Sequence, residues 1–118
     1  MKAEKNAAAA ASFEDMPIAE LKTMKGYGVS FQVCHRVYQA VCNYNAQYPD
    51  PELMIALNKS LLRSVAGCNN STAAEYLGYY AEDIATYHAT VGIDNPDFHN
   101  RKYHQGSDFA AAITALVA

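Results

Sequence analysis

The stretch from residue 29 to residue 48, VSFQVCHRVYQAVCNYNAQY, constrains the fold more than any other part of this chain. Its strongly polar residues recur at steps of four, three and four, as Gln32, Arg36, Gln39 and Asn43. On a helix that turns by about 100° per residue, these side chains form one narrow strip. Most of the remaining residues are apolar or aromatic, so other elements have to cover most of the helix circumference. The pattern predicts a central helix over residues 29–48.

A buried strand is the competing interpretation of the same stretch. Val29, Phe31 and Val33 alternate with polar residues, and β-branched residues are plentiful, as they are in strands. However, continuing the alternation would place His35 and Gln39 among the apolar positions. The polar strip fits a helix without exception, and we therefore predict a helix.

Capping and turn residues divide the rest of the chain into further short helices. The predicted ranges are about 16–25, 51–66, 72–91 and 96–105, followed by a final helix that begins after Ser107. Each range has apolar residues at helical spacing or a capping residue at its start. The sequence thus predicts an all-α protein, built as a compact bundle or orthogonal array of five to six short helices around the central one.

The chain has 118 residues, which is the usual size of a single domain. Residues 1–12 are Ala-rich and low in complexity, so we expect an N-terminal tail that is either a frayed helix or flexible. Residues 13–118 are predicted to form one helical domain, because no repeat or long linker divides them. Hydrophobic residues make up 51% of the chain and charged residues 18%, which is enough to form a core.

Charge and cysteine content argue against several classes of partner and location. The net charge is −3 and the nine basic residues are scattered, so no nucleic-acid partner is expected. No apolar run approaches the roughly 18 residues of a membrane span, so no membrane partner is expected either. The three cysteines lack CxxC spacing, and the N-terminal alanines make only a weak signal-like region. We predict a cytoplasmic protein without a cofactor.

Histidine and carboxylate side chains offer one possible chemistry. His88, His99, His104 and Asp97 could ligate a metal ion if the fold brought them together. This is the alternative functional interpretation, a metal- or ligand-binding protein and possibly an enzyme. Within one helix, His99 and His104 are five residues apart, so we expect their side chains to diverge instead of sharing a metal ion.

His35 and Cys42 share one face of the predicted central helix. A cysteine beside a histidine can act as a nucleophile with its base. Seven residues correspond to about 10 Å along a helix, which is too far for a direct hydrogen bond. We therefore expect His35 to be a structural residue that bonds to a carbonyl group or to a tyrosine.

Tyrosine is unusually common, with nine residues and no tryptophan in the chain. Its apolar ring and polar hydroxyl suit both the boundary of a small core and protein interfaces. A tyrosine-rich docking surface would include Tyr76, Tyr79, Tyr80, Tyr87 and Tyr103. The main functional hypothesis is a small soluble protein, not an enzyme, that binds another protein or its own copies. Inhibitors, adaptors and assembly components are proteins of this kind.

Overall fold

The structure is a computed structural model that describes residues 2–26 and 28–118. In this part of the chain eight α-helices and two short 3-10 helices are present, and the predicted all-α class is confirmed. The elements in chain order are α1 (Lys2–Ala10), η1 (Ala11–Phe13), α2 (Ile18–Leu21), α3 (Val29–Asn45), η2 (Pro51–Leu53), α4 (Lys59–Ala66), α5 (Asn70–Tyr79), α6 (Ala81–Val91), α7 (Pro96–His104) and α8 (Phe109–Thr114).

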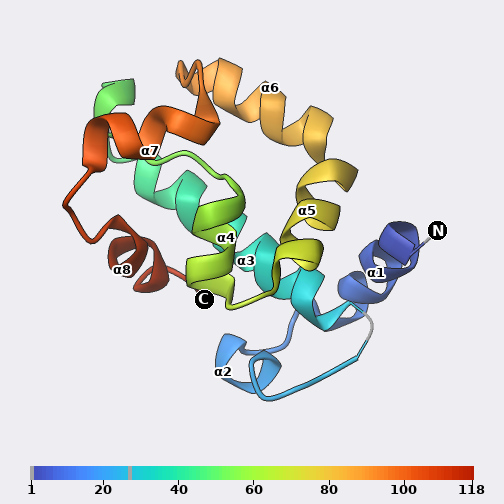
Figure 1. Ribbon diagram of the computed structural model, residues 1–118. Coiled ribbons are helices and arrows are strands. Elements are labelled where there is room, and N and C mark those ends of the chain that lie inside the picture. The colour runs from blue at the N-terminus through green and yellow to red at the C-terminus, as the bar shows by residue number, and fades with distance from the viewer. Residues whose placement is uncertain (1, 27) are drawn as a thin grey trace.

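Helix α3 runs through the middle of the molecule and contacts α1, α2, α4, α5 and α8 (Figure 1). Its apolar residues Val37 and Val41 are completely buried, together with Cys34. The helix ends at Asn45, three residues earlier than expected, because residues 46–48 turn away before Pro49. The long apolar helix is therefore the element around which the other helices pack.

The polar strip of α3 is only partly exposed to solvent. Gln39 and Asn43 are exposed, whereas Gln32 and Arg36 are buried. The Arg36 guanidinium donates hydrogen bonds to Gln32 Oε1 and to the backbone carbonyls of Phe13, Glu14, Met16 and Ala118, at 2.7–3.1 Å. A buried guanidinium requires such acceptors, and here they come from two distant segments. Arg36 therefore fastens residues 13–16 and the last residue to α3.

The Ala-rich segment that was expected as a tail forms helix α1. Ala10 is completely buried in the core, and Gln32 Nε2 donates to its carbonyl oxygen at 2.8 Å. Gly28 has a φ of 83° and lies directly against the backbone of Ala9 and Ala10. A side chain at Gly28 would collide with that backbone, so alanine and glycine together allow α1 to approach the start of α3 closely.

One predicted helix, over residues 51–66, is interrupted. Asp50 caps only the short turn η2, by accepting a hydrogen bond from Glu52 N. Residues 54–58 then run without helical structure, and α4 begins after Asn58, whose Oδ1 accepts from Leu61 N at 2.9 Å. The helical spacing of apolar residues continues across this segment. Its backbone groups, however, form hydrogen bonds with side chains of other helices and not with one another, as they would in a helix.

The predicted helix over residues 72–91 is divided into α5 and α6 at Tyr80. Tyr80 has φ −103° and ψ 20°, outside the helical region, and the chain changes direction there (Figure 1). Helix α5 also begins earlier than expected, because Asn69 caps it by accepting from Thr72 N. Gly78, near the break, is a poor helix former and weakens the continuity that the apolar pattern suggested.

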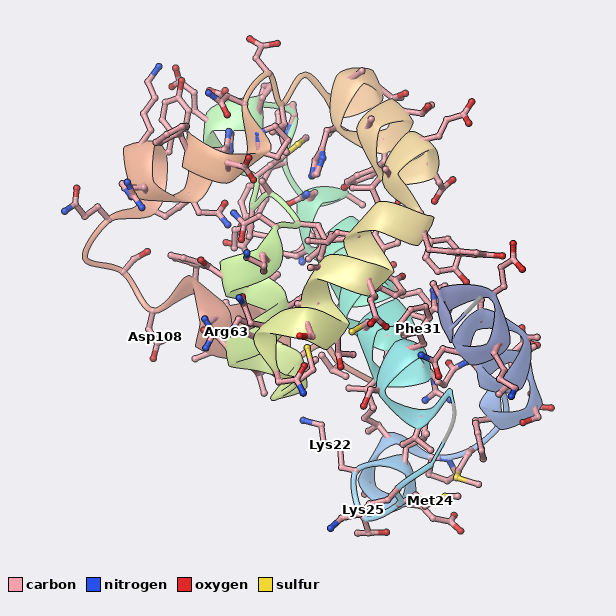
Figure 2. All side chains as sticks on the ribbon, turned by 45° about the vertical axis from the view of Figure 1, so that its right-hand side comes forward. Lys22, Met24, Lys25, Phe31, Arg63 and Asp108 are labelled. Carbon is pink, nitrogen blue, oxygen red and sulfur yellow. The ribbon has the colours of Figure 1, made fainter. Side chains whose placement is uncertain are left out.

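Helix α2 forms a small separate lobe beside the start of α3. Its Leu21 is completely buried and packs with Val29 and Val33 in a core cluster of its own. Figure 2 shows Lys22 and Lys25 around this lobe, at the edge of the molecule. In the two ranges that the structure describes, no helix has the length and apolar character needed to cross a membrane.

Candidate functional site

The buried segment from Met54 to Asn58 is held by asparagine side chains of two helices. Asn45 of α3 accepts a hydrogen bond from Ile55 N and donates one to Ile55 O, both at 2.8 Å. Asn100 of α7 makes the same pair with Ala56, at 2.8 and 3.0 Å. Each amide side chain thus replaces the two backbone partners that a neighbouring strand would provide.

Three histidines complete the hydrogen bonding of this segment. His88 Nε2 accepts from Leu57 N at 3.1 Å. His99 Nε2 and His104 Nε2 both donate to Met54 O, each at 2.8 Å. Because a carbonyl oxygen only accepts, both of these Nε2 atoms carry hydrogen, whereas Nε2 of His88 must not. The fold therefore brings together the three histidines that were candidate metal ligands, but around backbone groups.

The expected divergence of His99 and His104 was wrong. Their rings lie 6.2 Å apart and converge on the same oxygen. His104 is the last residue of α7, so its side chain reaches back along the helix end toward Met54. Asp97 is exposed and lines a different hollow, with Arg101. Among the described residues, no group of three or more His, Cys, Asp or Glu side chains could hold a metal ion.

The environment of His88 fixes its protonation state. Burial and, to a smaller extent, the nearby His99 lower the pKa of His88 to about 4, while Asp97 opposes the shift. At neutral pH the imidazole is uncharged, as its acceptor role toward Leu57 N requires. A second proton would remove the acceptor and would place a charge in the core.

His35 bonds to two tyrosines, which confirms the expectation of a structural role. Tyr76 Oη lies 2.7 Å from His35 Nδ1, and Tyr80 Oη lies 3.2 Å from His35 Nε2. In the neutral imidazole one ring nitrogen donates and the other accepts, so one tyrosine accepts and the other donates. Burial lowers the pKa of His35, which favours this neutral form.

An open hollow of about 520 Å³ lies beside His35. It is lined by His35, Tyr38, Gln39, Cys42, Asn43 and Asp83. Burial raises the pKa of the Cys42 thiol, which a hydrogen bond with Tyr87 partly offsets. Since a protonated thiol is a weak nucleophile, this hollow does not contain an activated Cys–His pair.

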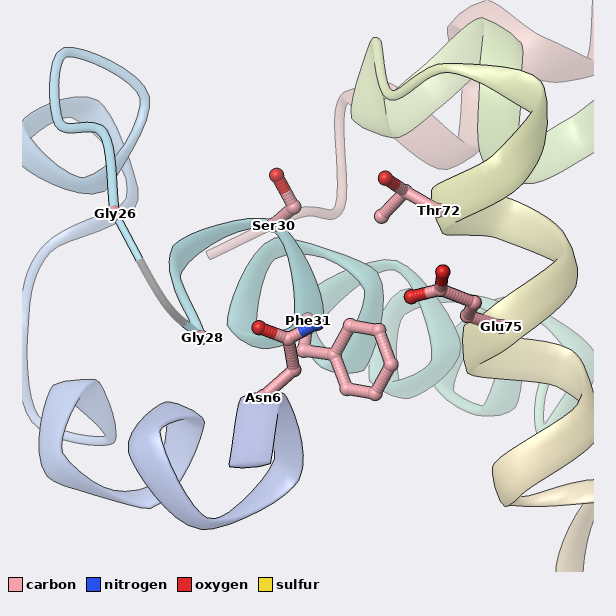
Figure 3. A pocket seen from close by; sticks show the side chains of 7 residues that line it. All are labelled: Asn6, Gly26, Gly28, Ser30, Phe31, Thr72 and Glu75. Atoms are coloured by element: carbon pink, nitrogen blue, oxygen red, sulfur yellow. The ribbon is translucent and has the colours of Figure 1, made fainter. Parts of the chain in front are cut away.

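A second hollow, of about 320 Å³, lies between α1, α3 and α5 (Figure 3). Its side chains are mainly hydrogen-bonding groups, those of Asn6, Ser30, Thr72 and Glu75, beside the ring of Phe31. These groups can bind polar atoms, but they include no histidine or cysteine.

The predicted tyrosine surface is divided by the fold. Tyr76 is 0% exposed, so it is not available to a partner. Tyr80 and Tyr87 are half-buried, and their hydroxyl groups bond to His35 and Asn45. Tyr79 of α5 is 46% exposed and Tyr103 of α7 is 39% exposed. Helices α5 and α7 lie apart (Figure 1), so the two exposed tyrosines stand on separate parts of the fold.

Three exposed apolar side chains lie on α7 and η2, two elements that contact each other, and we call them the α7–η2 surface. Phe98 is 54% exposed, Leu53 is 49% exposed and Tyr103 is 39% exposed. Between the two elements lies a hollow of about 180 Å³, lined in part by Pro51, Glu52, Asp94, Phe98, Lys102 and Tyr103. Phe98 was not predicted as a site residue. What distinguishes it in the sequence is that it is the one phenylalanine in the polar stretch 94–105. The helical spacing of Leu53 with Leu57 and Leu61 predicts a core position for it, but the side chain is exposed.

Two cations lie over the exposed rings of the α7–η2 surface. The Arg101 guanidinium carbon is 5.6 Å from the centre of the Phe98 ring, and Lys102 Nζ is 5.1 Å from that of Tyr103. These are cation–π distances, so each charge is held beside an aromatic side chain. The surface therefore combines apolar area with fixed positive charge.

Replacement of Asn45 by Asp tests the hold on residue 55. The Asp side chain keeps the acceptor for Ile55 N but loses the donor to Ile55 O and to Tyr87 Oη. We expect Asn45→Asp to lower the free energy of unfolding by about 3 kcal/mol at neutral pH, measured by urea denaturation. Asn43→Asp, on the exposed part of the same helix, is the matched control and should change it by less than about 0.5 kcal/mol. Equal losses in the two variants would contradict the assigned contacts.

The pH dependence of stability tests the role of His88. Its folded pKa of about 4 lies below the ordinary value of 6.5, so the unfolded chain binds a proton first as the pH falls. The free energy of unfolding should therefore decrease from pH 6.5 to pH 4, a window set by these two values. In His88→Gln, residue 88 does not titrate. The free energy of unfolding should therefore change less steeply with pH in this variant, by up to the slope that one proton contributes. Identical slopes of the free energy of unfolding against pH in the two proteins, measured by denaturant titration, would refute the role assigned to His88. His35 is present in both proteins and contributes equally to both slopes.

Comparisons with known proteins assign no function to these surfaces. No protein-family model matches the chain, and neither a curated protein nor a solved structure matches it. The polar side chains that the fold gathers most closely bond to backbone groups or to one another. The α7–η2 surface, with its exposed apolar side chains, is the candidate functional site.

Proposed function

We propose that this protein acts by protein–protein interaction and that the α7–η2 surface is its contact site. The exposure of Phe98 and Leu53 is the observation that supports the proposal. Of the five large hydrophobic side chains that are exposed in the described part of the chain, three lie on α7 or η2: Leu53, Phe98 and Tyr103. Clusters of this kind are typical of interaction sites, whereas single exposed apolar residues are common everywhere.

The chemistry of the surface suits a protein partner. Aromatic side chains and arginine are enriched among residues that dominate binding energy. Phe98 and Arg101 form such a pair, because the guanidinium lies over the ring. The inner side of α7 is fixed by the bonds of Asn100, so the outer side chains project from an anchored element. An anchored surface loses less conformational entropy on binding.

A second copy of this chain is the occupant that the charges favour. Glu52 of η2 and Asp94, which comes just before α7, line the hollow, while Arg101 and Lys102 lie on α7. In a two-fold dimer the same surface meets itself in reversed orientation. The acidic side of one copy would then face the basic side of the other, around the apolar centre. The proposed role is that of a small assembly component or adaptor that pairs with itself.

Sedimentation velocity over a range of protein concentrations tests this proposal. The wild-type protein should form a dimer as its concentration rises, and added salt should weaken the dimer because exposed charges are screened. Phe98→Ser should weaken dimerisation at least about tenfold, since central aromatic residues contribute most of the binding energy. Phe98 is exposed, so this variant should keep its far-UV circular dichroism spectrum.

Tyr79→Ser is the matched control, because Tyr79 is an exposed aromatic residue of α5, a helix that lies apart from α7 (Figure 1). It should leave the dimer unchanged. A wild-type protein that remains monomeric at all concentrations would exclude the second copy as occupant. Equal weakening by Tyr79→Ser and Phe98→Ser would show that the α7–η2 surface is not the contact.

A further inference from the structure

A hollow of about 290 Å³ lies between α4, α7 and α8. Residues of all three helices line it, and among them are Ser60, Ser64, Asp97, Arg101, Gln105 and Phe109. Its volume is close to the lower limit of roughly 300 Å³ that is typical of small-molecule sites. The exposed apolar residues Leu53 and Phe98 do not line it, so a ligand in this hollow does not depend on the proposed dimer.

Two asparagine side chains fix the walls of this hollow. Asn58, just before α4, donates a hydrogen bond to the carbonyl oxygen of Pro96, the first residue of α7, at 2.9 Å. Asn100 in α7 forms two hydrogen bonds with Ala56. Both asparagines are buried and line the hollow. The exposed side chains around them therefore project from helices that are held in place, which lowers the entropy lost on binding a ligand.

Two opposite charges line the hollow without neutralising each other. Asp97 and Arg101 are both exposed and lie four residues apart on α7, a spacing that commonly gives an ion pair. The Arg101 guanidinium instead lies over the Phe98 ring. The Asp97 carboxylate forms no hydrogen bond or ion pair with any residue that the structure describes. One anion and one cation, about one helical turn apart, are thus available to a ligand.

Uncharged groups complete the lining. Ser60 and Ser64 lie one turn apart on α4, and their hydroxyl groups form no hydrogen bond within the described ranges. The same is true of the exposed Gln105 amide. A hydroxyl group can donate to a carboxylate and can accept from an ammonium group. Half-buried Phe109 and Ala110 of α8 provide an apolar wall.

We propose that this hollow binds a free α-amino acid with a large apolar side chain. The ammonium group of the ligand donates to Asp97, and its carboxylate accepts from Arg101 and Gln105. Its side chain packs against Phe109. One helical turn is about 5.4 Å and a hydrogen bond spans about 2.9 Å, so two groups on one carbon atom can reach both charges.

The pair of charges selects a zwitterion over simpler ions. A phosphate or another simple anion in the hollow would meet the Asp97 carboxylate, and a simple cation would meet the Arg101 guanidinium. Such like-charge contacts oppose binding. A free amino acid carries both complementary charges and has no net charge.

NMR titration of the isotope-labelled full-length protein with L-phenylalanine tests the proposal, because the ring of this probe can pack against Phe109. For a ligand of this size we expect a dissociation constant of about 1 mM. The amide signals of Ser60, Ser64, Arg101 and Gln105 should shift and saturate. No saturable shift up to about 20 mM, roughly twenty times the expected constant, would overturn the proposal. Saturable shifts confined to residues outside this hollow would overturn it as well.

Two analogues of the probe and two variants test the charges. Phenylalanine amide lacks the carboxylate and N-acetyl-phenylalanine lacks the ammonium group. Each should bind the wild type at least about fivefold more weakly than L-phenylalanine, since each loses one ion pair. Arg101→Gln should weaken L-phenylalanine binding by a similar factor, with no further loss when the amide replaces the amino acid. Asp97→Asn should behave in the same way toward N-acetyl-phenylalanine.

Asp94→Asn and Lys102→Gln are the matched controls. Each removes an exposed charge of the same sign in or beside α7, from a residue that lines the neighbouring hollow instead. Both should leave the affinity for L-phenylalanine unchanged, and all four variants should keep the far-UV circular dichroism spectrum of the wild type. Equal affinity for L-phenylalanine and its two analogues would show that the charges are not recognised and would refute the assigned ligand class. Equal losses in the controls would refute the assigned site.

Discussion

The hydrogen bonds between side chains of three helices and the buried segment 54–58 are the interaction on which the rest of the structure depends. An extended backbone in a core has donors and acceptors that it cannot satisfy itself, and each one left unpaired would cost about 1–3 kcal/mol. Here Asn45, Asn100, His88, His99 and His104 satisfy them. Because these side chains come from α3, α6 and α7, the segment also fixes how those helices lie around it. Arg36 likewise donates to backbone carbonyl groups in residues 13–16 and so fixes that segment against α3.

This arrangement shapes the functional interpretation. The histidines that first suggested a metal site or a general base form hydrogen bonds with backbone groups. Fewer polar side chains are therefore left to form a catalytic centre. Helix α7 has both roles at once: Asn100 and His104 point inward, and Phe98 and Arg101 point outward. The proposed contact surface therefore stands on a helix whose inner face is anchored.

The sequence predicted the helical class and a long apolar central helix, over residues 29–48 where the structure has 29–45. It also predicted a structural His35 that bonds to a carbonyl group or a tyrosine. These predictions depend on periodicity and on residue chemistry within one helix. The sequence could not predict the break at residues 54–58. The apolar spacing of Leu57, Leu61 and Val65 continues through it, and only contacts from residues 10 to 50 positions away favour the extended backbone. The exposure of Phe98 likewise depends on long-range packing. The prediction that His99 and His104 diverge was wrong for the same reason, because it considered only their spacing along one helix.

Amide hydrogen exchange, followed by NMR, tests the central claim most directly. Ile55, Ala56 and Leu57 belong to no helix or strand, yet their N–H groups donate to Asn45, Asn100 and His88. Their amides should exchange as slowly as those of Val37 and Val41 in the centre of α3, through global unfolding only. Rapid exchange of these three amides, in a protein whose α3 amides remain protected, would contradict the claim that this segment is the held centre of the fold.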